Sequence, residues 1–203
     1  MRRLTAATIG IEAGDHVLDR SRGLTDDLRD FTSTAQSVSG RSALDVGCGK
    51  GFTTARMQTD LKPASLEALE PGSENSFEGA ADYLQSHGVP VSRLTLQQAA
   101  ELAQYQRAFD TVVVFKYNVD RSEKPTFVRA VASVVAEHGT VLITSIEKDR
   151  CYRGKGLDPS LHLIDNLRTC FASVKVKEVS HRSHMGERRE ALIVCCHPIR
   201  TTV

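Results

Sequence analysis

Hydrophobic residues in this chain gather in short runs that are separated by segments with hydrophobic residues at helical spacing. The runs lie at 43–46, 65–70, 109–115, 140–145 and 191–196. Helical spacing is found at 52–61, at 73–87, from 126 to about 138, and from 159 to about 171. Short apolar runs are typical of parallel strands buried on both faces, and helical spacing is typical of helices with one buried face. Their alternation predicts an α/β fold with a mostly parallel sheet.

The remaining segments complete the predicted set of elements. Leu94–Leu96 is expected to form a short third strand, and the valines at 174, 176 and 179 alternate with polar residues as in a half-buried strand. No helical pattern separates this strand from the run at 191–196, so the two are expected to form an antiparallel hairpin joined by a charged loop at 180–190. Residues 1–40 are expected to form a helical cap segment, followed by a single domain over 41–203.

Three alternate glycines follow the first strand directly. Gly47, Gly49 and Gly51 permit backbone angles and close approaches that a side chain would block, so a ligand can lie against bare backbone there. Asp45 stands at the carboxyl end of that strand, where open α/β sheets bind their ligands. Glu70 ends the second strand about twenty residues later, at the spacing typical of a carboxylate that binds ribose hydroxyls.

The sequence Asp45-x-Gly47-x-Gly49-x-Gly51, followed by Glu70, resembles the first two motifs of class I S-adenosylmethionine-dependent methyltransferases. A nicotinamide dehydrogenase more often has G-x-G-x-x-G, whereas here the third glycine comes one position early. The resemblance extends from about residue 43 to 197. It implies a Rossmann-like three-layer sandwich whose seven-stranded, mostly parallel sheet ends in an antiparallel hairpin, and it implies S-adenosylmethionine as the cofactor.

The resemblance also implies which residues bind the cofactor. The glycine turn would accommodate its methionine portion, Glu70 would bind the ribose, and Gln98-Ala99 would flank the adenine in place of the more usual Asp-Ala pair. Backbone at Phe115 and Lys116 would lie near the reactive end. The full set of expected cofactor-binding residues is Asp45, Gly47, Cys48, Gly49, Gly51, Glu70, Gln98, Ala99, Phe115 and Lys116.

The catalytic residues are not fixed by the sequence. Tyr117 and Asn118 follow the central strand at its ligand-binding end, where they either shape the acceptor pocket or merely cap the strand. The prolines that accompany such residues in methyltransferases of exocyclic amino groups are missing, and no Lys-Asp-Lys-Glu set of ribose 2′-O-methyltransferases is evident. Histidine suits a general base near neutral pH. The candidates are Tyr117, Asn118, His162, His181 and His184.

Composition narrows the remaining choices. The 203 residues carry a formal net charge of +1, so no global basic field favours nucleic acid. Five cysteines without a C-x-x-C pair argue against a disulfide framework and a cysteine-built zinc site, and no metal is expected. No apolar run of eighteen residues and no secretory signal is present, so we expect a cytoplasmic protein without a membrane span.

The sequence therefore predicts methyl transfer from S-adenosylmethionine to an oxygen, nitrogen or carbon nucleophile, with a small molecule as the acceptor. The oligomeric state is left open. Two alternatives stay open as well. Basic residues at 147–159 and 180–190 favour an RNA or cap methyltransferase, and a non-catalytic cofactor-binding or interaction module would keep the same motifs.

Overall fold

Helices and strands alternate along most of the chain. The computed structural model describes residues 38–115, 123–144, 159–183 and 186–199, and the side chains at 144, 159–162 and 177–192 fall outside that description. The elements are β1 (Ser42–Val46), α3 (Phe52–Arg56), the π-helical turn η2 (Met57–Leu61), β2 (Ser65–Leu69), α4 (Glu74–Gln85), β3 (Val91–Ser92), α5 (Leu96–Glu101), the 3₁₀ turn η3 (Ala103–Tyr105), β4 (Phe109–Val114), α6 (Lys124–Val134), β5 (Val135–Thr144), α8 (Pro159–Cys170), β6 (Phe171–Ser183) and β7 (Gly186–Pro198).

The strands form one seven-stranded sheet in the order β3-β2-β1-β4-β5-β7-β6. The first five strands are parallel, whereas β7 runs antiparallel to both β5 and β6. The chain proceeds outward from β1 to β2 and β3, then returns to place β4 on the other side of β1. This reversal makes a switch point at the carboxyl ends of β1 and β4, where open α/β sheets bind ligands.

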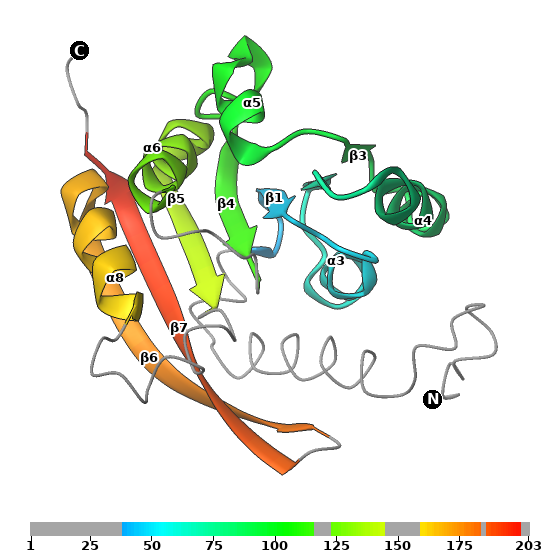
Figure 1. The fold of residues 1–203 in the computed structure, drawn as a ribbon. Helices are drawn as coiled ribbons and strands as arrows, with labels where there is room; N and C mark the ends of the chain where they lie inside the picture. The colour runs from blue at the N-terminus through cyan, green and yellow to red at the C-terminus, as the bar shows by residue number, and fades with distance from the viewer. Residues whose placement is uncertain (1–37, 116–122, 145–158, 184–185, 200–203) are drawn as a thin grey trace.

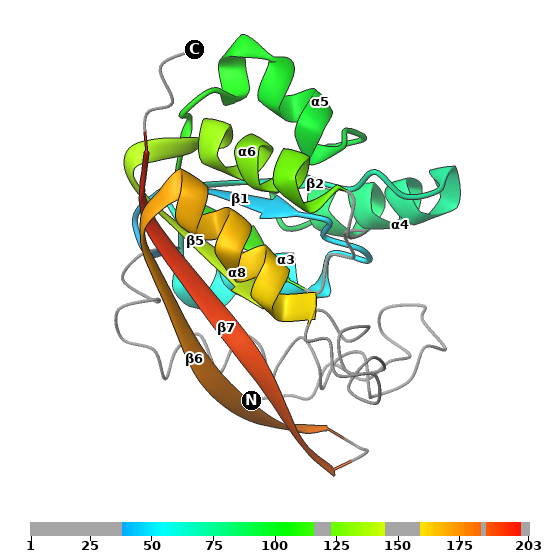
Figure 2. The ribbon, with the colours of Figure 1, turned by 60° about the vertical axis from the view of Figure 1, so that its left-hand side comes forward.

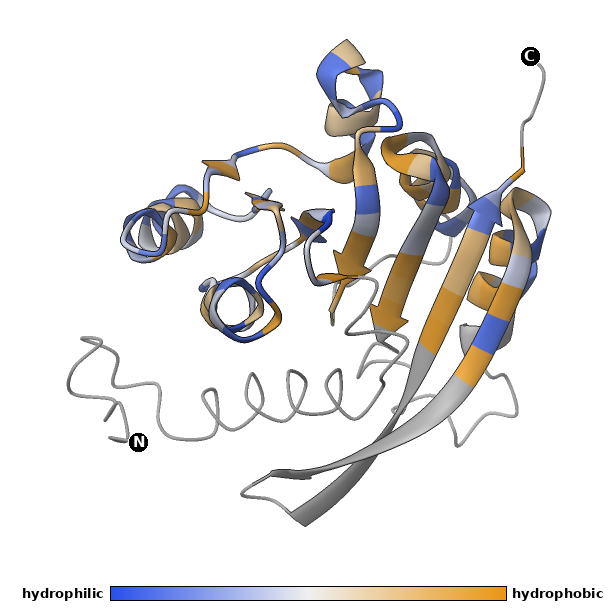
Figure 3. Cartoon of the chain, turned by 180° about the vertical axis from the view of Figure 1, so that it is seen from behind, coloured by the Kyte–Doolittle hydropathy of each residue, from blue (hydrophilic) through white to orange (hydrophobic). Residues whose placement is uncertain are grey.

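Helices cover both faces of the sheet, as Figures 1 and 2 show. On one face α5, α6 and α8 pack over a core that includes Leu96, Phe127 and Leu167. On the other face the helix formed by α3 and η2, together with α4, packs over a second core that includes Met57 and Leu84. The carboxyl-terminal parts of β4 and β5, which lie between these helices, are hydrophobic, as Figure 3 shows. The expected three-layer Rossmann-like sandwich is therefore confirmed.

Ser42 and Asp110 tie the two strands of the switch point together at their amino ends. The Ser42 hydroxyl and backbone N–H both donate to Asp110 Oδ2, at 2.9 and 3.1 Å, and the Asp110 N–H donates back to Ser42 Oγ at 3.0 Å. These bonds fix β1 against β4 although the two residues are 68 positions apart in sequence. Together with the backbone pairing from Ala43↔Thr111 to Asp45↔Val113, this contact sets where the carboxyl ends of β1 and β4 lie relative to each other.

The third strand lies earlier than expected. It is Val91–Ser92, and Leu96 already belongs to α5 instead of to a strand at 94–96. The reason is a capping box, in which Thr95 Oγ1 accepts from the Gln98 N–H at 3.1 Å and Gln98 Oε1 accepts from the Thr95 N–H at 2.9 Å. This pair of bonds satisfies backbone donors at the start of a helix and so favours a helix at Leu96.

Three further boundaries were predicted wrongly. The helix expected to end near 138–139 ends at Val134, because Val135 already pairs with Phe109 in the sheet. Phe171 begins β6 instead of ending α8. The segment 180–190, expected as a loop, belongs mostly to β6 and β7, which pair from Phe171↔Pro198 to Ser183↔Gly186. Polar residues form these strands because an antiparallel ladder bonds backbone groups whatever side chains they carry.

Some predictions lie largely outside the described residues. The proposed cap segment 1–40 is described only from Val38 onward, so the boundary between it and the domain stays a prediction. The four described cysteines, Cys48, Cys170, Cys195 and Cys196, are free thiols. In the described part of the chain no helix is long and apolar enough to cross a membrane, and no group of three potential metal ligands is present.

Candidate cofactor site

The glycine turn connects the carboxyl end of β1 to α3 and lies against the end of β2. Its backbone is fixed to β2 because the N–H groups of Gly47 and Cys48 both donate to the carbonyl of Leu69, at 2.8 and 3.0 Å. Gly49, with φ of 58°, has open space where a Cβ would be. The backbone at Gly49 is therefore uncovered on this side, and its contact with a ligand stays a prediction.

Gly51 serves packing instead. Its φ is 80°, and a Cβ there would lie 2.6 Å from Cγ of Leu84 in α4. The turn consequently lies directly on α4, and the aromatic ring of Phe52 makes an edge contact with Tyr83 of the same helix at a centroid distance of 5.1 Å. Only glycine allows both this backbone conformation and this close approach.

Replacing Gly51 with alanine should destabilise the fold by about 2 kcal/mol or more, because it combines a left-handed backbone with overlap in a packed core. Gly79→Ala is the matched control, since Gly79 lies in α4 with open space around its Cα. Alanine at position 79 should be neutral or stabilising by about 0.5–1 kcal/mol. Urea denaturation of both variants measures the difference, and equal stability of the two would refute this role of Gly51.

Glu70 bridges the glycine turn and the turn that follows β2. Its Oε2 accepts from the Gly49 N–H at 2.6 Å, and its Oε1 accepts from the Gly72 N–H at 2.9 Å. The Ser76 hydroxyl lies 3.5 Å from the same Oε1. The side chain is buried, at 7% exposure, yet these donors come from backbone on both sides and hold its carboxylate in place.

Asp45 is the second buried carboxylate of the site, with 2% exposure. Its Oδ2 accepts from the Thr54 hydroxyl at 2.5 Å, and Thr54 is itself fully buried in α3. Burial raises the pKa of Asp45 to about 6, the Thr54 hydrogen bond opposes this rise, and the negative charge of Glu70 adds to it. The two acidic groups therefore repel each other across a poorly solvated site.

Neither carboxylate has an ion-pair partner among the described residues, where the ion pairs are Arg56–Asp60, Arg93–Glu74 and Arg168–Asp165. A buried negative charge is costly unless a cation or hydrogen-bond donors compensate it. The site thus suits a ligand that brings positive charge and hydroxyl groups. S-adenosylmethionine has an ammonium, a sulfonium and a ribose diol, so the two acceptor carboxylates fit this cofactor.

Cys48 lies within the turn but is no nucleophile in this setting. Its pKa is raised above the ordinary value, first by burial and then by the negative charges of Asp45 and Glu70. The thiol consequently stays protonated at neutral pH. A protonated thiol attacks carbon poorly, because the thiolate is the reactive form. The backbone of Cys48 is engaged within the protein, since its N–H donates to the Leu69 carbonyl and its carbonyl accepts from the Gly51 N–H, so its contact with the cofactor stays a prediction.

Gln98 and Ala99 occupy the start of α5. The Gln98 carbonyl oxygen is engaged in the capping box with Thr95, so the free part of its exposed side chain is the Nε2 amide donor. Ala99 is fully buried in the core, and its N–H donates to the Thr95 carbonyl at 3.0 Å while its own carbonyl accepts from the Leu102 N–H at 3.0 Å. Their contact with adenine stays a prediction, as does the contact of Phe115, which is 8% exposed at the end of β4.

For the remaining predicted site residues, the structure describes either nothing or the backbone alone. Lys116, Tyr117, Asn118 and His184 lie outside the described part of the chain. His162 lies in α8 and His181 in β6, but their side chains are not among those described. The backbone of His181 pairs with that of Arg188, past the last β5–β7 pair at Thr144. The five catalytic candidates therefore remain predictions, and so does the role of Lys116 in cofactor binding.

Three positions at the site escaped the sequence analysis, namely Thr54, Gly72 and Ser76. Thr54 and Ser76 face Asp45 and Glu70 from helices, and nothing in their spacing marks them as site residues. The dipeptide Pro71-Gly72 is a typical turn signal. That the Gly72 N–H holds the Glu70 carboxylate could have been suspected only from its place two residues after the acid.

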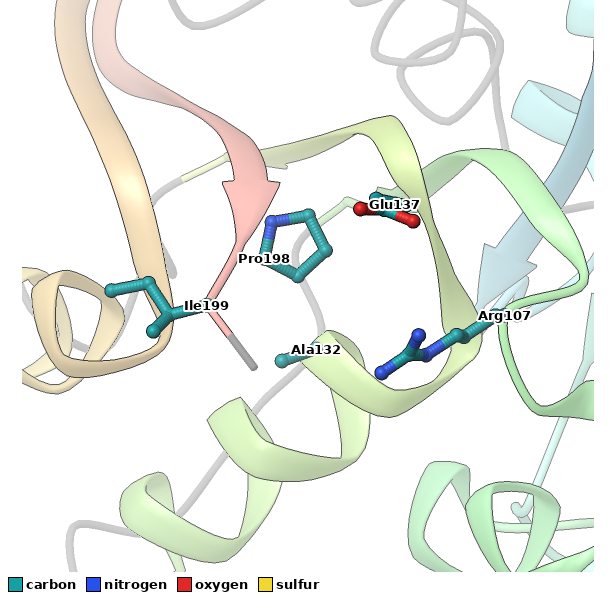
Figure 4. A pocket seen from close by; sticks show the side chains of 5 residues that line it. All are labelled: Arg107, Ala132, Glu137, Pro198 and Ile199. Carbon is teal, nitrogen blue, oxygen red and sulfur yellow. The ribbon is translucent and has the colours of Figure 1, made fainter. Parts of the chain in front are cut away.

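A shallow hollow of about 250 Å³, part of it open solvent, lies elsewhere (Figure 4). Arg107, Ala132, Glu137, Pro198 and Ile199 line it. Arg107 precedes β4 and Glu137 lies near the start of β5, so the hollow is at the amino ends of these parallel strands. The glycine turn follows the carboxyl end of β1, at the opposite edge, and the hollow is therefore separate from the cofactor site.

Comparison with known proteins agrees with this geometry. Residues 43–139 match the family model described as a methyltransferase domain. Comparison with curated protein sequences gives no match. Among solved structures, the N-methyltransferase NodS from Bradyrhizobium japonicum WM9, in complex with S-adenosyl-L-homocysteine, is similar with a TM-score of 0.65 and 16% identity. The alignment covers 95% of this chain and 98% of NodS.

Two other solved structures show the range of proteins with this fold. A possible histamine N-methyltransferase from Thermotoga maritima has a TM-score of 0.59 and 16% identity, over 89% of this chain and 91% of its own. The [4+2]-cyclase SpnF has a TM-score of 0.62 and 19% identity, over 89% and 82%. The family model thus identifies a methyltransferase domain at residues 43–139, and the solved structures show that the chain has the fold of class I S-adenosylmethionine-dependent methyltransferases.

Proposed function

We propose that this methyltransferase transfers the methyl group of S-adenosylmethionine to an oxygen, nitrogen or carbon nucleophile of a small molecule. One observation carries the cofactor half of the proposal. Glu70 is held by backbone N–H groups of two turns beside the buried Asp45, and neither acid has a described cationic partner. Such a pair suits a ligand that supplies both positive charge and hydroxyl donors.

In this proposal, each residue of the site binds a different part of the cofactor. Glu70 would accept the ribose hydroxyls, and the open backbone at Gly49 would lie against the methionine portion. The negative charge of Asp45 would attract the ammonium of that portion through a poorly solvated medium, where charge interactions are strong. Gln98 would offer its amide N–H groups to the ring nitrogens of the adenine, because its carbonyl oxygen is used by Thr95.

The bound cofactor supplies a methyl group that is already activated by the sulfonium. The protein must then bind the acceptor in line with that group and exclude water, which together account for much of the rate gain in such transfers. A general base is needed only where the nucleophile starts protonated. Among the predicted candidates, a histidine or the Tyr117-Asn118 pair would take this role.

A small acceptor is favoured over RNA on two grounds. The formal net charge of +1 provides no basic field for a polyanion. The solved structures of similar fold include one whose name refers to histamine, a small amine. Because the fold also occurs in a [4+2]-cyclase, the reaction itself needs a direct assay.

The assay would use S-adenosylmethionine with a tritium-labelled methyl group and a panel of small amines, phenols, carbon acids and a generic RNA. We expect S-adenosylhomocysteine and labelled product with a small acceptor. Calorimetry with S-adenosylhomocysteine alone accompanies the assay, and absence of binding there would refute the proposal. Methyl transfer to RNA alone, together with salt-dependent binding of RNA, would favour the RNA alternative. Binding of S-adenosylhomocysteine without methyl transfer to any member of the panel would favour a non-catalytic module.

A further inference from the structure

The turn at Pro71-Gly72, which connects β2 to α4, is hydrogen-bonded to the Glu70 carboxylate. The Gly72 N–H donates to Glu70 Oε1 at 2.9 Å, and the Ser76 hydroxyl from α4 approaches the same atom at 3.5 Å. The other oxygen, Oε2, is held by Gly49 from the glycine turn at 2.6 Å. The carboxylate is thus fixed at both oxygens by groups from two separate turns.

There is no room for a side chain at position 72. A Cβ built on Gly72 would overlap Glu70 Oε1 and would lie 3.2 Å from both Cβ and Oγ of Ser76. Gly72 does not have the positive φ that explains the glycines of the first turn, so backbone conformation does not account for a glycine here. The space above its Cα is instead filled by the Glu70 carboxylate.

We infer that Gly72 is a positioning residue for cofactor binding, because its missing side chain and its N–H together set the place of the Glu70 carboxylate. This inference rests on the proposed function, in which Glu70 binds the ribose. Any side chain at position 72 would displace the carboxylate from the site, although it would leave Glu70 itself intact.

The bonding of the carboxylate explains why its position matters. An ionised carboxylate has about four lone-pair sites, two on each oxygen. The backbone bonds from Gly49 and Gly72 use one site on each oxygen, and the long contact from Ser76 is readily given up. One acceptor site remains on each oxygen, which matches the two hydroxyls of a ribose diol. The diol is therefore bound by a group that is already oriented before it arrives.

A double-mutant cycle tests this inference by calorimetric titration with S-adenosylhomocysteine. Gly72→Ala should weaken binding about 10-fold relative to wild type, and Glu70→Ala should weaken it at least as much. Once the carboxylate is absent, alanine at position 72 has nothing to displace. Glu70→Ala/Gly72→Ala should therefore bind within 2-fold of Glu70→Ala. Gly79→Ala in α4, where a Cβ has open space, is the control and should bind as wild type.

A second measurement separates positioning of Glu70 from a general effect on the turn. Wild type should lose about 10-fold in affinity when the 2′,3′-dideoxy analogue replaces S-adenosylhomocysteine, whereas Gly72→Ala should lose less than 3-fold. Undiminished discrimination in Gly72→Ala, or a full Gly72→Ala effect in the Glu70→Ala background, would overturn the inference. Absence of wild-type binding would instead refute the proposed function.

The test remains decisive if Gly72→Ala does not fold. Relief of the overlap predicts that the double variant folds, and an unfolded double variant would count against the inference. Ser76→Ala removes the long contact to the same carboxylate. Because this contact is given up when the diol binds, the variant should bind S-adenosylhomocysteine within 2-fold of wild type and should lose as much affinity for the dideoxy analogue as wild type does. A loss as large as that of Gly72→Ala would contradict this account of the carboxylate.

Discussion

Replacing Asp45 with asparagine is expected to stabilise the protein at neutral pH and to weaken its binding of S-adenosylmethionine. Burial, opposed by the Thr54 hydrogen bond and reinforced by the charge of Glu70, raises the pKa of Asp45 to about 6 from an ordinary 3.8. A difference of this size corresponds to roughly 3 kcal/mol. Asparagine keeps an acceptor for Thr54 but carries no charge, so most of this cost should be recovered at pH 7.

The pH dependence follows from the sign of this pKa difference. Between about pH 4 and pH 6 folded Asp45 holds a proton that the unfolded chain has already lost. Its contribution to the free energy of unfolding therefore falls as the pH rises through this window, and it is most favourable below pH 4. Urea denaturation at pH 4, 5, 6 and 7 should show a steeper loss of stability in wild type than in Asp45→Asn. Parallel curves for the two proteins would contradict the assignment.

The Asp45→Asn substitution and low pH, which both favour folding, should both weaken the binding of S-adenosylmethionine. Asp45→Asn should bind S-adenosylmethionine at pH 7.5 about 10-fold more weakly than wild type, because the charge that attracts its ammonium is gone. Wild-type affinity should also fall below about pH 6 as the carboxylate is protonated. Thr54→Val supplies the control, since loss of the hydrogen bond that lowers the Asp45 pKa should move this midpoint to higher pH.

Replacing Glu70 with alanine should have the second large effect. Two hydrogen bonds from ribose hydroxyls to a carboxylate are lost, each with a net contribution of about 1.5–3 kcal/mol, and water that enters the space of the missing side chain restores part of this sum. We expect a 10- to 100-fold loss of affinity for S-adenosylhomocysteine, or about 1.4–2.8 kcal/mol, measured by calorimetry. Circular dichroism should confirm that the variant is folded.

Glu74→Ala is the matched control for this variant. Glu74 begins α4 only four residues later and is exposed, with Arg93 no nearer than 4.0 Å. Its removal should change the affinity by less than 2-fold. Unchanged binding in Glu70→Ala would mean that the ribose lies elsewhere, and the cofactor arrangement given above would have to be abandoned.

Local sequence signals were sufficient to predict the central strands of the sheet and the positions of Asp45 and Glu70 at the ends of β1 and β2. Gly49 and Gly51 need left-handed backbone, and Asp45 and Glu70 stand where a buried strand ends, so short stretches reveal them. The order of the strands followed from the family resemblance. The start of α5 was missed although Thr95-x-x-Gln98 is a capping-box signal, because the residues 94–96 were interpreted by hydrophobicity alone.

Other features depend on contacts between distant residues. Val135 joins the sheet because it meets Phe109, and the polar segment 180–190 forms strands because the two halves of the hairpin pair with each other. Strand propensity reflects such neighbours more than the residue itself. The role of Gly72 likewise depends on where the Glu70 side chain points, which no spacing rule states.

The contacts that hold the two acids are all short in sequence. Gly49 and Glu70 are 21 positions apart, Asp45 and Thr54 are 9 apart, and Ser76 and Glu70 are 6 apart. The two acids and the groups that hold them thus lie on one continuous stretch from β1 to the start of α4, whereas β4 joins it across 68 positions. Substitutions beyond α4 therefore remove none of the hydrogen bonds that hold Asp45 and Glu70, so this stretch is a local unit that can be varied and tested by itself.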